Sequence, residues 1–196
     1  MTAAASFDYI ADTMPDTGGM EFQEKLQVLS EASVHRHFDA FLDIAWDSPE
    51  FEVIENDPRW VLPEVDALAN TDWYKSLSLE RQMEVGKYRL ANIMKVGLQF
   101  EQVLNGGVMA HLIGMPNHRA EFRYATHEVT EECHHTQMFQ EGVNRIGVDV
   151  KGGPKWFIAV APFLCLAGRY LPNIFFIGIL AGEEPIDFLR KSVLRS

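Results

Sequence analysis

Two long stretches of this sequence place apolar residues at helical spacing, and one short turn sequence separates them. The stretches cover residues 78–113 and 118–147, and Gly-Met-Pro-Asn occupies 114–117. Their apolar stripes advance in steps of three and four, which predicts two amphipathic helices, and the Gly and Pro predict the turn between them. Because so short a connection makes consecutive helices antiparallel neighbours, we expect a helical hairpin over about residues 78–147.

Each apolar stripe contains one glutamate. The stripe of Glu101 consists of Met94, Leu98, Leu104, Val108 and Leu112, and the stripe of Glu132 consists of Phe122, Ala125, Val129, Thr136, Phe139, Val143 and Ile146. Glu101 and Glu132 are equally distant from the turn, so the hairpin places them opposite each other to within about one helical turn. A buried carboxylate needs a partner, a proton or a metal ion.

His135 follows Glu132 by three residues. This spacing is about one helical turn, so the carboxylate and the imidazole can converge on one ion, and such ligands suit iron, manganese or zinc. A glutamate that faces a Glu-x-x-His sequence on an antiparallel helix is half of a diiron carboxylate site. The alternative is a buried Glu–His pair without a metal, which repulsion between two facing carboxylates disfavours.

The sequence Glu-Glu-Cys-His-His at residues 131–135 offers a second register, Glu131 with His134. Glu132 is in phase with the apolar stripe, whereas Glu131 is turned by about 100° towards the side of the helix. We therefore predict Glu132 and His135 as ligands, with Glu131 and His134 either supporting the ligands or lying at the surface.

Residues 157–182 are almost entirely apolar, but Pro162, Arg169 and Pro172 interrupt them. Neither half reaches the roughly 20 apolar residues that a membrane span needs. We therefore predict two buried helices, or one kinked helix, at the centre of the bundle, with a membrane-associated hairpin as the alternative.

Two glutamates, Glu183 and Glu184, follow this apolar stretch. A carboxylate pair is unexpected at the end of so apolar a helix, and either residue could supply a further metal ligand from a third helix. The alternative is an ordinary helix end whose acidic residues reach solvent.

The first part of the chain carries weaker signals. The small and polar residues 1–20 predict a flexible N-terminus. Residues 21–46 carry apolar side chains near helical spacing and predict a first helix. Residues 47–73 contain three prolines and predict a long connection that includes a short helix.

The pattern as a whole predicts the fold class. No stretch of useful length alternates apolar and polar residues as a strand does, so we expect an all-α protein, an antiparallel helical bundle. A single domain should cover residues 21–196, with the metal-site hairpin at about 78–147 and the apolar helices at about 156–196.

The charge balance limits the partners. Lys and Arg number 17 against 28 Asp and Glu, which gives a formal net charge of −11. Nucleic acid and anionic lipid both require a basic face, so we expect neither nucleic acid nor a membrane as a partner. The two cysteines, and a start without a basic and apolar leader, favour a cytoplasmic location.

Three segments carry a resemblance to a known family: FEQVLNGG at 100–107, HEVTEECHHTQMFQEGVNR at 127–145 and FFIGILAGEEPID at 175–187. Over roughly residues 72–196 the chain resembles the p-aminobenzoate N-oxygenase (AurF-like) family of ferritin-like diiron oxygenases. The resemblance implies a ferritin-like bundle around two iron ions, with manganese as the alternative metal. It also implies that O2 is activated to oxidise a small organic substrate, such as an aromatic amine that becomes N-oxygenated.

The same resemblance implies a set of metal ligands: Glu101, Glu132 with His135, and Glu183 in preference to Glu184. The family's last helix, with two histidines and a glutamate, has no counterpart after Asp187. We therefore expect the N-terminal part of a longer bundle, or alternatively a homodimer that completes the site between chains. The rival functions are another diiron activity, such as desaturation or peroxide reduction, and a helical bundle with an incomplete metal site and no catalysis.

Overall fold

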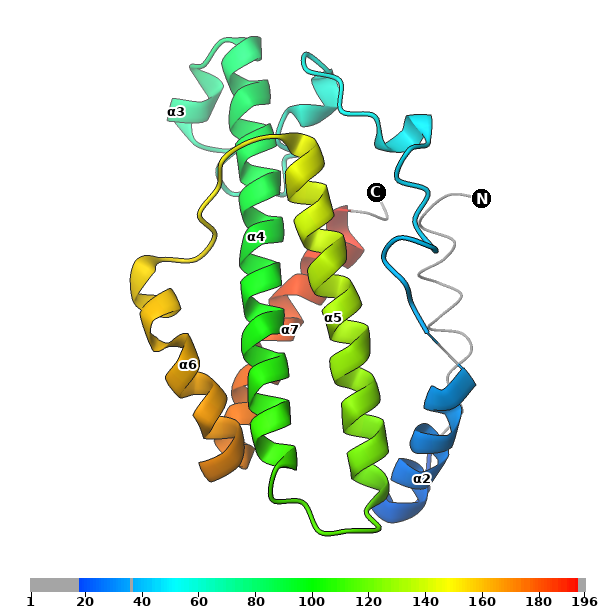
Figure 1. Cartoon of the computed structure of the whole chain (residues 1–196). Helices are drawn as coiled ribbons and strands as arrows, with labels where there is room; N and C mark the ends of the chain where they lie inside the picture. The colour runs from blue at the N-terminus through cyan, green and yellow to red at the C-terminus, as the bar shows by residue number, and fades with distance from the viewer. Residues whose placement is uncertain (1–17, 36, 194–196) are drawn as a thin grey trace.

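The structure is a computed structural model that describes residues 18–35 and 37–193, with side chains described up to residue 184. All regular elements in these residues are helical and none is a strand, which confirms the predicted all-α class. Figure 1 shows two long helices side by side with shorter helices on their flanks, the arrangement of a ferritin-like helical bundle. Of the flexible N-terminus predicted for residues 1–20, residues 1–17 lie outside the described part of the chain.

The two long helices form the predicted hairpin. Helix α4 spans Leu79–Leu112 and helix α5 spans Ala120–Ile146, so each bound lies within two residues of the prediction. Ser78 caps α4, because its hydroxyl accepts a hydrogen bond from the backbone N–H of Arg81 and so satisfies one free donor of the first turn. The turn reverses the chain, and α4 and α5 then pack along their length (Figure 1).

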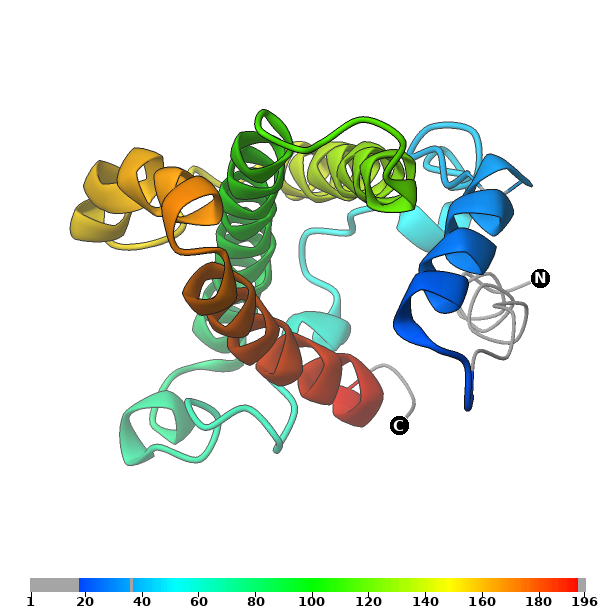
Figure 2. The same ribbon diagram turned by 90° about the horizontal axis from the view of Figure 1, so that it is seen from below.

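Two further helices lie on the α4 side of the hairpin. Helix α6 spans Lys155–Tyr170 and helix α7 spans Pro172–Val193. Figure 2 shows α6 beside α4, on the side away from α5, and α7 running obliquely from the end of α6. A Cβ atom on Gly168 would lie 2.1 Å from the carbonyl oxygen of Gly107, and a Cβ atom on Gly107 would lie 2.0 Å from the ring of Phe175. The missing side chains therefore let α6 and α7 approach α4 closely.

The expectation that α6 and α7 are buried at the centre is wrong for the described residues. Phe163 is 71% exposed, and Ile174 and Ile177 are 67% and 68% exposed. Each helix contacts the bundle along one side, where Gly168 and Phe175 are buried. Hydropathy shows that apolar surface is present, but the positions of neighbouring helices decide which side is covered. None of the described helices combines the length and apolar character that a membrane span requires.

The first helix is shorter than predicted. Helix α2 spans Phe22–Ala32 and a single 3-10 turn, η1, spans Ser33–His35, whereas the sequence predicted helix to residue 46. Beyond this point the Asp39 carboxylate accepts hydrogen bonds from the backbone N–H groups of Phe41 and Leu42. Such side-chain bonds offer the backbone an alternative to the helix, and the chain continues instead along α5.

The long connection over residues 47–73 is confirmed, and it contains three short elements. These are the 3-10 turns η2 (Pro49–Phe51) and η3 (Pro58–Trp60) and the helix α3 (Asp72–Lys75). Element η3 packs against the first turns of α4, where a Cβ atom on Gly86 would collide with the backbone of Trp60. The connection therefore returns the chain to the start of the hairpin.

Candidate metal centre

Three potential metal ligands converge between α4 and α5: Glu101, Glu132 and His135, which we call the inner cluster. One ligand atom from each residue lies within 4.8 Å of the other two. Nδ1 of His135 is 2.7 Å from Oε2 of Glu132, one turn earlier on α5. The hairpin therefore brings together the glutamate of one helix and the Glu-x-x-His of the other, as their equal distance from the turn predicted.

Glu101 is the most deeply buried member of the inner cluster. Its residue is only 6% exposed, and its Oε2 atom is buried without a hydrogen-bond partner among the described residues. Burial, followed by the nearby negative charge of Glu132, raises the pKa of Glu101 to about 9. In the metal-free protein Glu101 therefore holds a proton at neutral pH, and a cation bound between the carboxylates would take over that role.

Glu132 and His135 form a charged pair beside Glu101. Burial acts to raise the pKa of Glu132, but the hydrogen bond and the positive charge of His135 outweigh it and lower the pKa. Burial acts to lower the pKa of His135, but the hydrogen bond and the charge of Glu132 raise it. These shifts favour Glu132 as an anionic ligand, and a metal would compete with the proton for the ring of His135.

Helix α7 brings Glu183, rather than Glu184, to this centre. Glu183 is half-buried and Glu184 is exposed. Burial raises the pKa of Glu183, the charge of Glu132 raises it further, and the charge of His135 opposes the change. Glu183 is not one of the three residues within mutual ligand distance, but its charge also acts on Glu101. It therefore lies beside the inner cluster, where it can approach a bound metal.

The second register, Glu131 with His134, faces a different part of the molecule. Oε2 of Glu131 accepts a hydrogen bond of 3.0 Å from the backbone N–H of Phe38. Nδ1 of His134 lies 4.0 Å from Oδ2 of Asp39. Both residues therefore contact the segment that follows α2, and neither takes part in the inner cluster.

Glu128 is a half-buried acid near the centre that the sequence patterns did not single out. It lies one turn before Glu132 on α5, and burial raises its pKa while a hydrogen bond to Tyr124 acts in the opposite direction. The same contact, together with burial, raises the pKa of the Tyr124 hydroxyl. Glu128 lies outside the apolar stripe, and its spacing of four residues from Glu132 was the only signal in the sequence.

The inner cluster and Glu183 together provide three carboxylates and one imidazole. Carboxylates and imidazole from neighbouring helices are the donors by which helical bundles hold iron and manganese. The unpartnered Oε2 atom of Glu101 also fits a missing cation, because a buried acceptor without a partner is costly. The residues present thus suit a divalent transition metal.

Comparison with known proteins agrees with this geometry. The family model of p-aminobenzoate N-oxygenase AurF matches residues 20–196. Proteins from Mycobacterium bovis and from two strains of Mycobacterium tuberculosis, each named only as uncharacterized, are 53% identical over 175 residues. The match covers 89% of this chain, which spans about half (52%) of the length of these relatives. No solved structure matches. With a family match over nearly its whole length, the chain belongs to the p-aminobenzoate N-oxygenase AurF family.

Proposed function

We propose that the protein is a non-haem diiron oxygenase that uses O2 to oxidise a small organic substrate, with N-oxygenation of an aromatic amine as the reaction. The observation that carries the proposal is the pair of facing carboxylates, buried Glu101 and half-buried Glu132, with His135 at 2.7 Å from Glu132. Membership of the N-oxygenase family supports the reaction class. Because the chain spans about half of its relatives, the activity is proposed for the whole protein.

Glu101, Glu132, His135 and Glu183 would hold the iron. When bound, ferrous iron supplies the electrons for reducing O2, from which one oxygen atom is transferred to the substrate. Manganese accepts the same donor types, so metal loading has to be compared for the two ions.

The protein residues prepare the site in three ways. Glu101 releases its proton when the metal neutralises the facing carboxylates, which adds a negative ligand only where a cation is present. The hydrogen bond between Glu132 and His135 fixes both side chains in one orientation before metal binds. The burial of Glu101 keeps water away from that side of the centre and strengthens its electrostatic interactions.

The proposal is tested by loading the full chain with ferrous iron without oxygen and then measuring bound iron by elemental analysis. We expect up to about two iron ions per chain, the number that a diiron carboxylate site holds. Oxygen is then added with a primary aromatic amine, and hydroxylamine and nitro products are sought by mass spectrometry. Protein loaded with redox-inactive zinc is the matched control and should give no product. A chain that retains no iron would overturn the proposal.

A further inference from the structure

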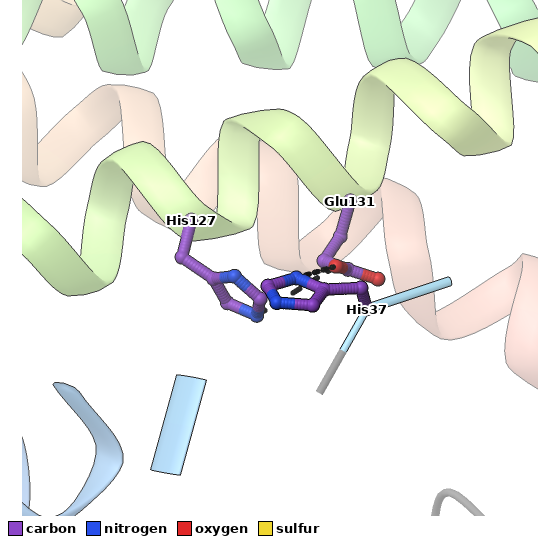
Figure 3. Close-up of side chains that lie close together, drawn as sticks. All are labelled: His37, His127 and Glu131. Carbon is purple, nitrogen blue, oxygen red and sulfur yellow. Dashed lines mark ion pairs between the residues drawn. The ribbon is translucent and has the colours of Figure 1, made fainter. Parts of the chain in front are cut away.

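A second group of potential ligands lies on another flank of α5. His37, His127 and Glu131, which we call the outer cluster, each place one ligand atom within 4.8 Å of the other two. Oε1 of Glu131 is 3.8 Å from Nε2 of His127 and 4.0 Å from Nδ1 of His37. Figure 3 shows the two imidazole rings and the carboxylate turned toward one another, two from α5 and one from the segment after η1.

The hydrogen bond on the far side of the His37 ring decides which nitrogen faces the cluster as an acceptor. Nε2 of His37 is 3.2 Å from the carbonyl oxygen of Val34. A carbonyl oxygen only accepts, so Nε2 carries the hydrogen, and in the neutral ring Nδ1 has a free lone pair. Nδ1 lies 4.0 Å from the Oε1 atom of Glu131. A cation placed between these two atoms would satisfy both as acceptors.

The carboxylate of Glu131 is oriented so that one of its oxygens, Oε1, faces the two histidines of the outer cluster. The backbone N–H of Phe38 donates to Oε2 at 3.0 Å, which orients the carboxylate. The other oxygen, Oε1, is buried and has no hydrogen-bond partner among the described residues. A buried carboxylate oxygen without a partner is costly, and its two near neighbours are imidazole nitrogens that can also act as ligands.

We propose that the outer cluster binds one divalent transition-metal ion of the zinc type. Two imidazoles and one carboxylate are a common set of zinc ligands and leave a fourth position for water. In a tetrahedral site, ligand atoms at about 2.0–2.1 Å from the ion lie roughly 3.3 Å apart. The observed separations of 3.8 and 4.0 Å therefore need to close by roughly 0.5–0.7 Å, through rotation of the side chains.

The surroundings supply what such a site needs besides its ligands. The Val34 carbonyl and the Phe38 N–H orient a histidine and a carboxylate from outside the site, as hydrogen bonds around bound metals do. The side chain of His37 is 66% exposed, whereas those of His127 and Glu131 are 15% and 19% exposed. An ion can therefore enter from the His37 side and reach ligands that are already in place.

A metal at this position would fasten the segment after α2 to the helix that carries the inner cluster. In its absence the segment reaches α5 near the cluster through the Phe38–Glu131 hydrogen bond and the contacts of Asp39 and Phe38 with His134. The proposed ion adds a bond from His37 to the same helix. The inference is independent of the proposed oxygenase activity, because the two clusters share no residue.

Zinc binding to the full chain tests this proposal. The double variant Glu132→Gln/His135→Gln removes the inner cluster, and zinc affinity is then measured by competition with a chromophoric chelator. We expect one zinc ion per chain to remain. Adding His127→Ala should lower its affinity by at least about 100-fold, since loss of a ligand exceeds the 10–100-fold effect of groups that only support ligands. His35→Ala is the matched control, because this exposed histidine precedes His37 and lies outside the cluster.

Hydrogen exchange gives a second measurement, first on the wild-type chain and then on one variant. Zinc should slow exchange of the backbone amides around Phe38, and His37→Ala should abolish that effect without changing iron loading of the inner cluster. Equal zinc affinity with and without His127→Ala would overturn the proposal, as would the absence of zinc-dependent protection.

Discussion

The inner and outer clusters lie on two flanks of the same helix, but they differ in charge and in the source of their ligands. The inner cluster combines two carboxylates with one imidazole and joins α5 to α4, whereas the outer cluster combines one carboxylate with two imidazoles and joins α5 to the segment after α2. Glu101 is 6% exposed, whereas the His37 side chain is 66% exposed. A carboxylate-rich buried site suits iron or manganese, and an imidazole-rich site at the surface suits zinc.

The difference arises from a shift of one residue along α5. Glu131 and Glu132 are adjacent, so their side chains point about 100° apart. Glu132 therefore faces α4, and Glu131 faces the backbone of Phe38. Two neighbouring glutamates thus serve two different sites, and substitutions of each can separate the sites experimentally.

The largest expected effect comes from replacing each of the two glutamates, Glu131 and Glu132, by alanine in separate variants. Glu132→Ala should lower the iron affinity of the inner cluster by at least about 100-fold, because it removes a ligand and frees His135. Glu131→Ala should leave iron loading within about twofold of wild type, because this residue lies outside the inner cluster. Iron content after anaerobic loading measures both. If Glu131→Ala removes the iron and Glu132→Ala does not, the assignment of the two glutamates is reversed.

The next effect concerns the pH dependence of the metal-free protein. An unfolded glutamate titrates at about 4.3, whereas Glu101 in the folded chain titrates at about 9. Between these values the folded state holds a proton that the unfolded state has lost, so the free energy of unfolding decreases as the pH rises.

Glu101→Gln should remove this dependence and be more stable than wild type by roughly 1–3 kcal/mol at pH 8, because a neutral amide replaces a buried acid. Chemical denaturation of both proteins at pH 5, 6.5 and 8, with a chelator present, measures the difference. Parallel curves for the two proteins would show that Glu101 has an ordinary pKa. The zinc affinity of the outer cluster should be the same in both proteins.

A smaller effect should follow from moving α7. A Cβ atom on Gly182 would lie 2.5 Å from the ring of Phe100 on α4, so Gly182→Ala should push away the turn that carries Glu183. We expect iron affinity to fall by roughly tenfold and zinc affinity to remain unchanged, because the charge of Glu183 acts on residues of the inner cluster. Gly178→Ala is the matched control, since its added Cβ atom would meet no atom within 4 Å. Unchanged iron affinity in Gly182→Ala would exclude Glu183 as a ligand.

The smallest effect concerns the hydrogen bond that joins the outer cluster to the backbone. In metal-free protein, Glu131→Ala should lower the free energy of unfolding by about 1 kcal/mol, because the N–H of Phe38 loses its acceptor. Glu131→Gln keeps an acceptor oxygen and should cost less. Thermal unfolding at neutral pH, with hydrogen exchange at Phe38, distinguishes the two variants. Equal free energies of unfolding for Glu131→Ala and Glu131→Gln would mean that the hydrogen bond from Phe38 to Glu131 contributes nothing to stability.

The hairpin and the inner cluster were predictable because their signals are local and periodic. The spacing of the stripes indicates which face of each helix is apolar, and the turn at 114–117 relates the two helices by symmetry. That phase and that symmetry predicted three neighbouring side chains, those of Glu101, Glu132 and His135. The structure brings the three together. Glu183 was favoured over Glu184 from the family resemblance; it is half-buried and its pKa responds to the charges of Glu132 and His135, and its role as a ligand stays a prediction.

The parts that could not be predicted depend on contacts between distant segments. Beyond α2 and η1 the backbone N–H groups of Phe41 and Leu42 bond to the side chain of Asp39, an arrangement that periodicity does not detect. The exposure of Phe163 and Ile177 depends on where α6 and α7 pack. The outer cluster brings His37 to residues about ninety positions later in the chain, and no spacing rule links residues so far apart.

The sequence by itself therefore determined the class, the hairpin and the pair of carboxylates that faces a histidine, because helical periodicity fixes the direction of each side chain from its own helix. Only the tertiary structure decided which helix or segment packs against each of those side chains. It placed the segment after α2, rather than another helix, against Glu131, and it left the outer sides of α6 and α7 open. These outcomes follow from packing between distant parts of the chain, whose free energy depends on complementary surfaces rather than on the order of neighbouring residues.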